Sequence, residues 1–384
     1  MDYIEDYDYL QNWVCKIRFM LEKMKSIASE SSGKCFFTIG NTTKQTDGLR
    51  PYTTPIRKVS NGVVCGVVVF TQTQGILAAS IVDKFVDSVI VDAEKKLPLL
   101  LGLDPKPFIN AGLPVPDLAN KNNDELCPET WNLSSACFGA VNNADCFEYK
   151  SNDMTVEGLW YYLASSMKGL SGRNVAIIGG GNIGFKLAIK LVESGCNVQF
   201  VRRDKSKGQA LVEAINIIKP PATKATVLYN DDPVAASTDS DAIIGCTNGK
   251  IAITSDMVRR MMPGGLLVDV GKGSISSEGV NIALEMGVNV LRYDVTSAID
   301  GMIATVESNC ETSVKMGRKA LADGIVLVSG GYLGAEGDMV VDDFRKPEQI
   351  FGICDGHGDF KQTISSSEEL ALSKVRQQFG IEGA

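Results

Sequence analysis

The chain alternates between helical and extended patterns of hydrophobic residues. Apolar side chains recur every three or four positions across residues 4–28, which predicts a long amphipathic helix. Short apolar runs at 35–39, 62–71 and 87–93 are typical of buried strands, and a helical pattern covers 74–86. This strand–helix–strand order predicts an open parallel α/β sheet.

A second group of alternating elements begins with a predicted connecting helix over residues 155–172. Residues 104–153, which precede it, are rich in Asn, Asp and Pro and favour loops. Further apolar runs predict strands at 175–178, 197–201, 224–230, 241–248, 265–271 and 289–295, with helices at 183–194, 255–265 and 277–287. The rest of the chain predicts a helix over 302–322, a strand over 324–331 and a last helix over 366–379.

The glycine-rich turn after the first strand of this second group carries a specific motif. Gly179, Gly181 and Gly184 fit the pattern G-x-G-x-x-G between an apolar strand and a helix. Glycines at these places permit a tight turn, close approach of a pyrophosphate and close packing of the helix on the strand. The helix N-terminus, with Asn182 and Ile183, offers unpaired N–H groups to an anion. We therefore predict a dinucleotide site.

Basic residues follow the next predicted strand. Arg202 and Arg203 come directly after it, and two lysines follow within the next four residues. Arginine at this place accommodates the 2′-phosphate of NADP, whereas an acidic residue binds the ribose hydroxyl of NAD. The cations favour NADP as the cofactor. NAD is possible because one register would place Asp204 on the ribose, and a solvated basic turn would select neither.

These patterns predict an α/β protein with two doubly wound parallel-sheet domains and a cleft between them. We expect residues 155–301 to form a dinucleotide-binding Rossmann domain. Residues 1–154 together with 302–384 are expected to form the substrate or catalytic domain. A chain of 384 residues is long enough for both.

Composition limits the classes of partner and site. The net charge of −8 argues against nucleic acid or an acidic membrane surface as the main partner. No apolar run approaches the roughly 20 residues that span a bilayer, and the acidic start is unlike a signal peptide. The ten cysteines include no C-x-x-C pair, so we expect reduced thiols, no metal site and a cytoplasmic protein. A small-molecule substrate is the expected partner, and the helix over 4–28 is a possible homodimer contact.

Residues 155–300 resemble the nicotinamide domains of amino-acid dehydrogenases, shikimate dehydrogenase and S-adenosylhomocysteine hydrolase. The segment "SGRNVAIIGGGNIG" is similar to the linker and glycine turn of all three. The segment "GCTNGKIAITSDMVRRMMPGGLLVDVGKGSI" is similar to the part of the hydrolase around its nicotinamide ribose. The basic residues after the second strand are more similar to shikimate dehydrogenase, which implies NADP. The single histidine of the chain departs from the hydrolase, which uses several.

Ligands of doubly wound sheets bind beyond the carboxyl ends of the strands, which selects further candidates. In the first domain the rule selects the turn 71–74, suited to a substrate carboxylate, and the polar residues 92–96. In the second domain it adds four residues to the cofactor site: Cys246, Thr247, Asn248 and Lys272.

Reduction of a carbonyl or imine needs a proton donor near the atom that gains charge. Lys58 ranks first, because "TTPIRK" is a loose relative of the lysine motif of shikimate dehydrogenase. Lys95 ranks second because it follows a strand end. Asp153, within "NDMTVEG", is expected to orient such a lysine. His357 ranks third, since imidazole titrates near neutral pH, although such a histidine more commonly lies in a surface loop.

We therefore predict an NADP-dependent oxidoreductase, a dehydrogenase or reductase that transfers a hydride to or from a small polar carbonyl or imine substrate. Two alternatives stay open. One is an enzyme like S-adenosylhomocysteine hydrolase that uses bound NAD transiently, and the other is a non-catalytic nicotinamide sensor.

Overall fold

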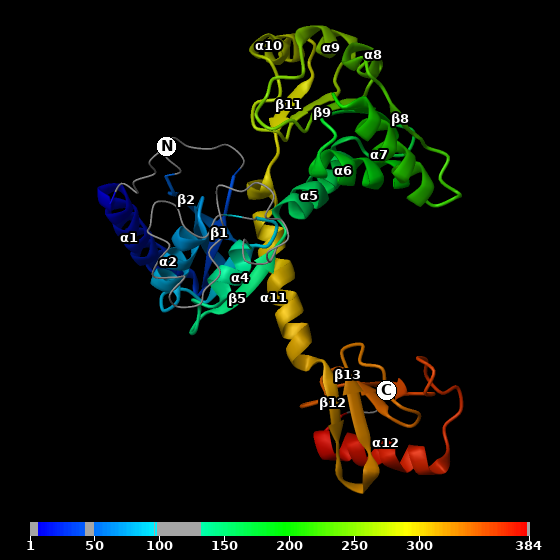
Figure 1. Ribbon diagram of the computed structural model, residues 1–384. Helices are drawn as coiled ribbons and strands as arrows, with labels where there is room; N and C mark the ends of the chain where they lie inside the picture. The colour runs from blue at the N-terminus through cyan, green and yellow to red at the C-terminus, as the bar shows by residue number, and fades with distance from the viewer. Residues whose placement is uncertain (1–6, 43–49, 96, 98–131, 382–384) are drawn as a thin grey trace, which may run out of the picture. The chain divides into compact units, whose positions relative to one another are not determined.

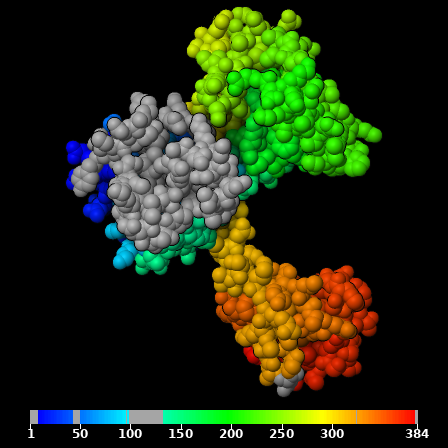
Figure 2. All heavy atoms as spheres, in the orientation of Figure 1, coloured from blue at the N-terminus to red at the C-terminus, as the bar shows by residue number. Residues whose placement is uncertain are grey.

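The computed structural model describes residues 7–42, 50–95, 97 and 132–381. The chain divides into two compact units, Met1–Met302 and Ile303–Ala384 (Figures 1 and 2). The first unit contains two sheets and the second contains one. No helix within the described ranges is long and apolar enough to cross a membrane.

The first sheet contains five strands with helices packed on it. The strands are β1 (Lys34–Gly40), β2 (Tyr52–Val59), β3 (Gly62–Val68), β4 (Ser88–Asp92) and β5 (Asp145–Tyr149), and the helices are α1 (Tyr7–Ser31), α2 (Gln72–Val82) and α4 (Leu133–Phe138). The strand order is β2-β3-β1-β4-β5. All neighbours run parallel except β2, which pairs antiparallel with β3 at the edge.

Alternation along the strands of this sheet determines which residues meet the helices. Phe37, Cys65 and Val89 point to one face, where they share a buried cluster with Trp13 and Ile17 of α1. Residues of α2 and α4 belong to the same cluster. The three helices therefore pack on one face of the first sheet, as expected where successive strand residues alternate between faces.

The second sheet contains six parallel strands in the order β11-β10-β9-β6-β7-β8. Its strands are β6 (Asn174–Ile178), β7 (Asn197–Val201), β8 (Val227–Tyr229), β9 (Ala242–Gly245), β10 (Leu266–Asp269) and β11 (Asn289–Arg292). Its helices are α5 (Ser151–Ser166), α6 (Asn182–Glu193), α7 (Lys205–Ile218), α8 (Pro233–Ala236), α9 (Ser255–Arg260), α10 (Ser277–Glu285) and the 3₁₀ helix η3 (Val295–Ala298).

Helices cover both faces of this second sheet (Figure 1). Val175 and Ile177 of β6 belong to one buried cluster with residues of α5 and α6, while Ile178 belongs to another with Met257 of α9 and Ala283 of α10. The order and the two covered faces are those of a doubly wound Rossmann domain, as the sequence predicted.

The second unit begins within helix α11 (Ile299–Lys315) and has a sheet of its own. The order is β12-β13-β14-β15, with strands β12 (Gly317–Ala320), β13 (Val326–Ser329), β14 (Met339–Val341) and β15 (Ile350–Ile353). The unit also contains the 3₁₀ helix η4 (Ala322–Gly324) and helix α12 (Ser366–Phe379). Leu327, Met339 and Val375 share its buried core. The predicted association of residues 302–384 with 1–154 stays a prediction, as does a cleft between the sheet domains.

Several predicted elements need correction. The predicted helix over 302–322 is too long, because α11 ends at Lys315 and β12 occupies residues after it. Strands β2 and β5 and helix α7 were not predicted. The predicted loop region 104–153 contains α4 and β5, and its residues up to 131 lie outside the described ranges.

Candidate functional site

The strand order of the second sheet places the glycine turn at its topological switch point. The chain runs from β6 to β8 on one side of β6 and returns to β9 on the other. Ligands of such sheets bind in the crevice where the order reverses. Gly179 follows β6 and Cys246 follows β9, and the Cys246 N–H donates to the carbonyl of Ile178 at 2.8 Å. The two segments predicted to bind the cofactor therefore meet.

The four glycines of the turn have different surroundings. Gly179 has φ +111°, and a Cβ there would lie 2.8 Å from the carbonyl of Cys246. A Cβ on Gly180 would lie 2.6 Å from the ring of Phe200, and one on Gly184 would collide with the carbonyl oxygen of Gly179. These three glycines are required by the fold itself.

Gly181 differs from the other three. A Cβ at this position would meet no atom within 4 Å, so the space beside it is open. Gly181 is also the N-cap of α6, and no side chain caps the helix N-terminus. Uncapped N–H groups beside open space form an anion site at the positive end of the helix dipole. The geometry fits a dinucleotide pyrophosphate, together with Asn182 and Ile183 in the first turn.

Arg202 lies against this turn from the end of β7. Its guanidinium donates a hydrogen bond to the carbonyl oxygen of Gly180. Its Nε is buried and has no hydrogen-bond partner among the described residues. Arg203 is exposed, and no ion pair of its guanidinium occurs within the described part of the chain. Arg203 is therefore exposed to a phosphate, whereas the unpartnered Nε of Arg202 is buried against the turn.

Asp204 has a structural role that the sequence left open. It is the N-cap of α7, and its Oδ1 accepts the backbone N–H of Lys207 at 3.1 Å. That hydrogen bond lowers the pKa of Asp204, so the carboxylate stays ionised as a cap. Lys207 lies 3.5 Å from Asp204 and Lys205 pairs with Asp231 at 2.9 Å, so these two lysines have acidic partners.

The loops after β9 and β10 are joined by a hydrogen bond beside the glycine turn. Thr247 Oγ1 donates to the carbonyl of Lys250 at 2.5 Å, and the Gly249 N–H donates to the carbonyl of Gly271 at 2.7 Å. The predicted cofactor residue Thr247 thus stabilises its own turn, while the Asn248 side chain is exposed. Burial, followed by the Asp269 charge, raises the pKa of Cys246 to about 12, so its thiol stays protonated at neutral pH.

Lys272 lies in the loop after β10 in an unusual backbone conformation. Its φ is +59°, in the left-handed region that a residue with a side chain seldom adopts. The carboxylate of Asp269 fixes this loop by accepting the N–H of Gly273 at 2.7 Å and that of Ser274 at 3.1 Å. Such strain persists where the surroundings hold it, often at functional sites.

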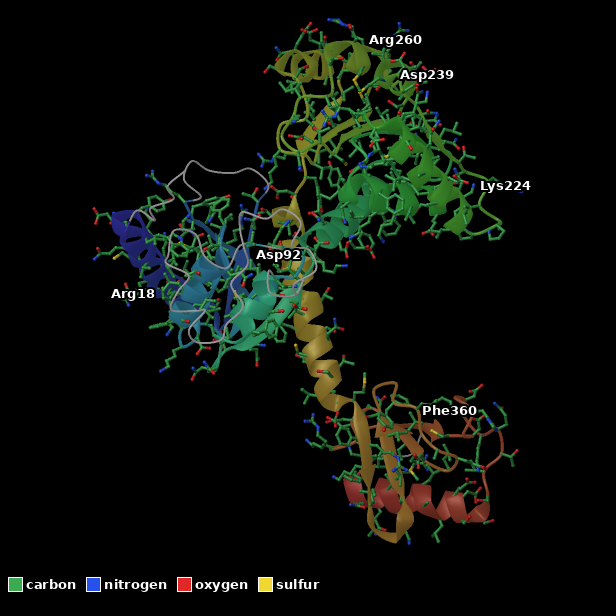
Figure 3. All side chains as sticks on the ribbon, viewed as in Figure 1. Arg18, Asp92, Lys224, Asp239, Arg260 and Phe360 are labelled. Atoms are coloured by element: carbon green, nitrogen blue, oxygen red, sulfur yellow. The ribbon has the colours of Figure 1, made fainter. Side chains whose placement is uncertain are left out.

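The strand order of the first sheet reverses between β1 and β4, and Asp92 lies there. Asp92 ends β4 (Figure 3), and its side chain is 1% exposed. Its Oδ1 accepts the N–H of Glu94 at 3.0 Å, whereas its buried Oδ2 has no hydrogen-bond partner among the described residues. Burial raises the pKa of Asp92 despite the Lys95 ammonium, which lies 3.9 Å from Oδ2.

Tyr149 occupies the same edge of the first sheet. It ends β5 directly opposite Asp92. Its hydroxyl lies over the end of β1, 2.9 Å from the position of a Cβ on Gly40, so glycine at 40 leaves room for the phenol. Burial raises the pKa of Tyr149, and the carboxylates of Asp92 and Glu94 raise it further. The hydroxyl is therefore a proton-bearing donor at neutral pH.

A network of charges joins the first sheet to helix α6. Lys186 of α6 donates to Asp153 and lies 3.6 Å from Glu94. Asp153 also pairs with Lys150 at 2.9 Å, and Glu94 accepts the backbone N–H of Asn152 at 2.8 Å. Asp153 therefore orients Lys186 and Lys150, rather than Lys58 as predicted. The three-residue spacing of Lys150 and Asp153 could have predicted their ion pair from the sequence. No feature of the sequence near Lys186 could have predicted its contact with Asp153.

The other predicted catalytic residues lie elsewhere. Lys58 is exposed and pairs with Val63 near the start of β3, at the edge of the sheet opposite Asp92. This position contradicts the expectation that Lys58 joins Asp153. His357 is exposed in the loop after β15, where its N–H donates to Asp355 at 2.7 Å. Within the described ranges, no group of three or more His, Cys, Asp or Glu side chains is arranged to hold a metal ion.

The predicted substrate turn after β3 is engaged in structural bonds. Thr71 accepts the N–H of Gln74 at 3.1 Å, and the Gln74 side chain accepts the N–H of Phe70 at 2.9 Å. Gln72 donates to the carbonyl of Leu97 at 2.8 Å. These amides hold the start of α2 and the segment after β4. Lys96, also a candidate, lies outside the described residues.

A family model matches the middle segment of the chain. Residues 174–273 match the family model described as "NADP oxidoreductase coenzyme F420-dependent". The match begins at β6 and ends after β10, so it includes the glycine turn, Arg202 and the loop after β9. It agrees with the dinucleotide-binding domain that the sequence predicted for this segment. No curated protein sequence matches the chain.

Solved structures resemble parts of the chain at low sequence identity. L-tryptophan dehydrogenase from Nostoc punctiforme is 12% identical over 71% of this chain and 72% of its own, with a TM-score of 0.37. Cinnamyl alcohol dehydrogenase from Sorghum bicolor is 16% identical over 47% of this chain, with a TM-score of 0.31. The chain spans 46% of that enzyme. Ornithine carbamoyltransferase from Pyrococcus furiosus is 12% identical over 77% of this chain and 94% of its own, with a TM-score of 0.39.

Proposed function

We propose that the protein is an NADP-dependent oxidoreductase that transfers a hydride to or from a small polar carbonyl or imine substrate. The observation that carries this proposal is the site at Gly181. Open space, uncapped N–H groups and the Arg202 guanidinium lie around one turn, within a segment that matches an NADP oxidoreductase family.

The residues of the site fit the parts of NADP. The first turn of α6 would hold the pyrophosphate, and Arg202 with Arg203 would hold the 2′-phosphate through charge-assisted hydrogen bonds. The cap role of Asp204 favours NADP over NAD, because its carboxylate is engaged by Lys207. When bound, the cofactor supplies the hydride donor or acceptor.

The chain's own residues would place the proton. Tyr149 and Lys95 both carry donors at the carboxyl edge of the first sheet, and Tyr149 bears its proton at neutral pH. A donor must come within hydrogen-bond reach of the atom that gains charge. We assign this part to Tyr149 or Lys95 in preference to Lys58, which lies at the opposite edge.

Cofactor titration of the wild-type protein tests the proposal. We expect NADPH to bind at least about tenfold more tightly than NADH in calorimetry, as for a charged contact of about 1.4 kcal/mol or more. Loss of NADPH absorbance with a panel of small aldehydes, 2-oxo acids and their ammonia-derived imines would then report turnover. Absence of binding to either cofactor would refute the proposal, and equal affinity for both would refute the assignment of NADP.

A further inference from the structure

Tyr229 holds the backbone that carries the two arginines after β7. It is the last residue of β8, and it pairs with Phe200 of β7 at the point where the ladder between these strands ends. Arg202 lies beyond that point, and its carbonyl oxygen accepts a hydrogen bond from the Tyr229 hydroxyl at 3.0 Å. The tyrosine side chain therefore supplies a donor to a backbone carbonyl that the sheet no longer pairs.

A glycine in helix α7 makes room for this tyrosine. Gly208 is buried near the start of α7, where a glycine is less favourable than an alanine. A Cβ at this position would lie 2.3 Å from Cε2 of Tyr229 and 3.4 Å from the Cβ of Arg202. The glycine thus lets the ring pack against the helix, from where its hydroxyl reaches Arg202. The hydrogen bond and the close packing are separate observations that fix Tyr229 in the same place.

Arg203 lies between two fixed points of the backbone. Before it, the Tyr229 hydroxyl holds the carbonyl of Arg202. After it, Asp204 caps helix α7 by accepting the N–H of Lys207 at 3.1 Å. The side chain of Arg203 is exposed. Binding costs less when the backbone is already in place, so these two anchors prepare the Arg203 guanidinium for a phosphate.

We propose that Tyr229 is a positioning residue for the 2′-phosphate of NADP and sets the preference for NADP over NAD. It acts through its hydrogen bond to the Arg202 carbonyl, which fixes the place from which Arg203 extends. This inference rests on the proposed function, because it assigns a further residue to the 2′-phosphate site described there.

The parts of the site that NAD and NADP share do not depend on Tyr229. The Gly179 N–H donates to the carbonyl of Val201 at 3.0 Å, so the glycine turn is joined to β7 by a backbone bond of its own. A purely structural tyrosine would stabilise the fold and leave the ratio of the two cofactor affinities unchanged when altered. That ratio therefore distinguishes a positioning role from a structural one.

Calorimetric titration of NADPH and NADH into Tyr229→Phe tests the proposal, because phenylalanine keeps the ring and removes the hydroxyl. We expect NADPH affinity to fall about fivefold and NADH affinity to change by less than about twofold, as for one lost hydrogen bond that affects the phosphate alone. Gly208→Ala displaces the ring by another route and should shift the ratio of affinities in the same direction. Thermal unfolding shows that each variant is folded.

Tyr9→Phe is the matched control. The Tyr9 hydroxyl also donates to a backbone carbonyl, that of Pro51 at 2.9 Å, but it does so beside the first sheet. This variant should keep the wild-type ratio of NADPH and NADH affinities. A changed ratio in Tyr9→Phe would show that the loss of any such bond alters selectivity, and would overturn the assignment to Tyr229.

A double variant shows whether Tyr229 acts through Arg203. Adding Tyr229→Phe to Arg203→Ala should weaken NADPH binding by no more than about a further twofold, because the contact that Tyr229 positions is already absent. Equal losses for both cofactors, an unchanged ratio in Tyr229→Phe, or full additivity in the double variant would each overturn the proposal while a wild type that prefers NADPH keeps the proposed function. A wild type without that preference would refute the assignment of NADP, and this inference with it.

Discussion

The guanidinium of Arg202 donates a hydrogen bond to the carbonyl oxygen of Gly180. This contact ties the end of β7 to the turn that follows β6. Arg202 therefore helps to fix the shape of the glycine turn. Its Nε is buried and has no hydrogen-bond partner among the described residues. Arg203 is exposed, and no hydrogen bond from its guanidinium to the turn occurs among the described residues.

The two arginines should therefore respond differently to substitution. Arg203→Ala should weaken NADPH binding by roughly 1.5–3 kcal/mol and leave NADH binding unchanged, because it removes a charged contact to the 2′-phosphate alone. Arg202→Ala should weaken both cofactors, since the turn loses its bond to Gly180. Calorimetry with both cofactors on both variants measures this. Unchanged NADPH affinity in Arg203→Ala would show that Arg203 does not touch the phosphate.

Asp83 stabilises the link between α2 and β5. Its Oδ1 accepts the N–H groups of Asn142 and Asn143 at 2.8 Å and of Ala144 at 3.1 Å. Burial opposes ionisation, but these N–H groups hold the pKa of Asp83 well below its usual range. Asp83→Asn should lower the free energy of unfolding at pH 7 by about 1–2 kcal/mol.

The pH dependence of this effect has a definite sign. Because the folded pKa of Asp83 is lowered, its stabilisation is present above the unfolded value of about 4 and is lost as the pH falls below it. Urea unfolding should therefore show that the difference in the free energy of unfolding between wild type and Asp83→Asn is smaller at pH 3 than at pH 7. A difference of constant size would mean that the carboxylate charge contributes nothing.

Asp92 should show the opposite behaviour. Its folded pKa is raised, so the folded state favours the protonated acid, and the wild type loses stability as the pH rises from about 4 through the folded pKa. Asp92→Asn should raise the free energy of unfolding at pH 7 by about 1–2 kcal/mol, because a neutral group replaces a buried charge whose desolvation outweighs its ion pair with Lys95. The difference should vanish near pH 3. Destabilisation at pH 7 would show that the ionised carboxylate is satisfied in the folded protein.

The glycine turn and the central strands of the dinucleotide domain could be predicted because each depends on residues that are close together in the sequence. The glycine spacing required a strand before it and a helix after it, and β6 and α6 occupy those places. The apolar residues of β9 and β10 are buried on both faces of a parallel sheet, so each strand appears in the sequence as a continuous hydrophobic segment.

The missed features depend on contacts between distant parts of the chain. Strand β2 is half exposed and contains Pro55, so it lacks the apolar run of a central strand. Its antiparallel direction carries Lys58 away from the carboxyl edge of the sheet, which the sequence could not show. Helix α7 begins with polar and basic residues, a composition that is also typical of a turn, so the helix was not predicted. The contact of Lys186 with Glu94 joins residues 92 positions apart and leaves no periodic signal.

The central claim is that the turn at Gly181 holds the pyrophosphate of a dinucleotide. Gly181→Val tests it most directly, because its side chain would enter space that no protein atom occupies within 4 Å of the Cβ. Calorimetric titration of NADPH into wild type and Gly181→Val, with thermal unfolding to confirm that the variant is folded, is the decisive measurement. We expect a melting temperature close to that of the wild type and a loss of NADPH affinity of about 100-fold or more, as a side chain would block the phosphate. A folded variant that binds NADPH with wild-type affinity would contradict the account.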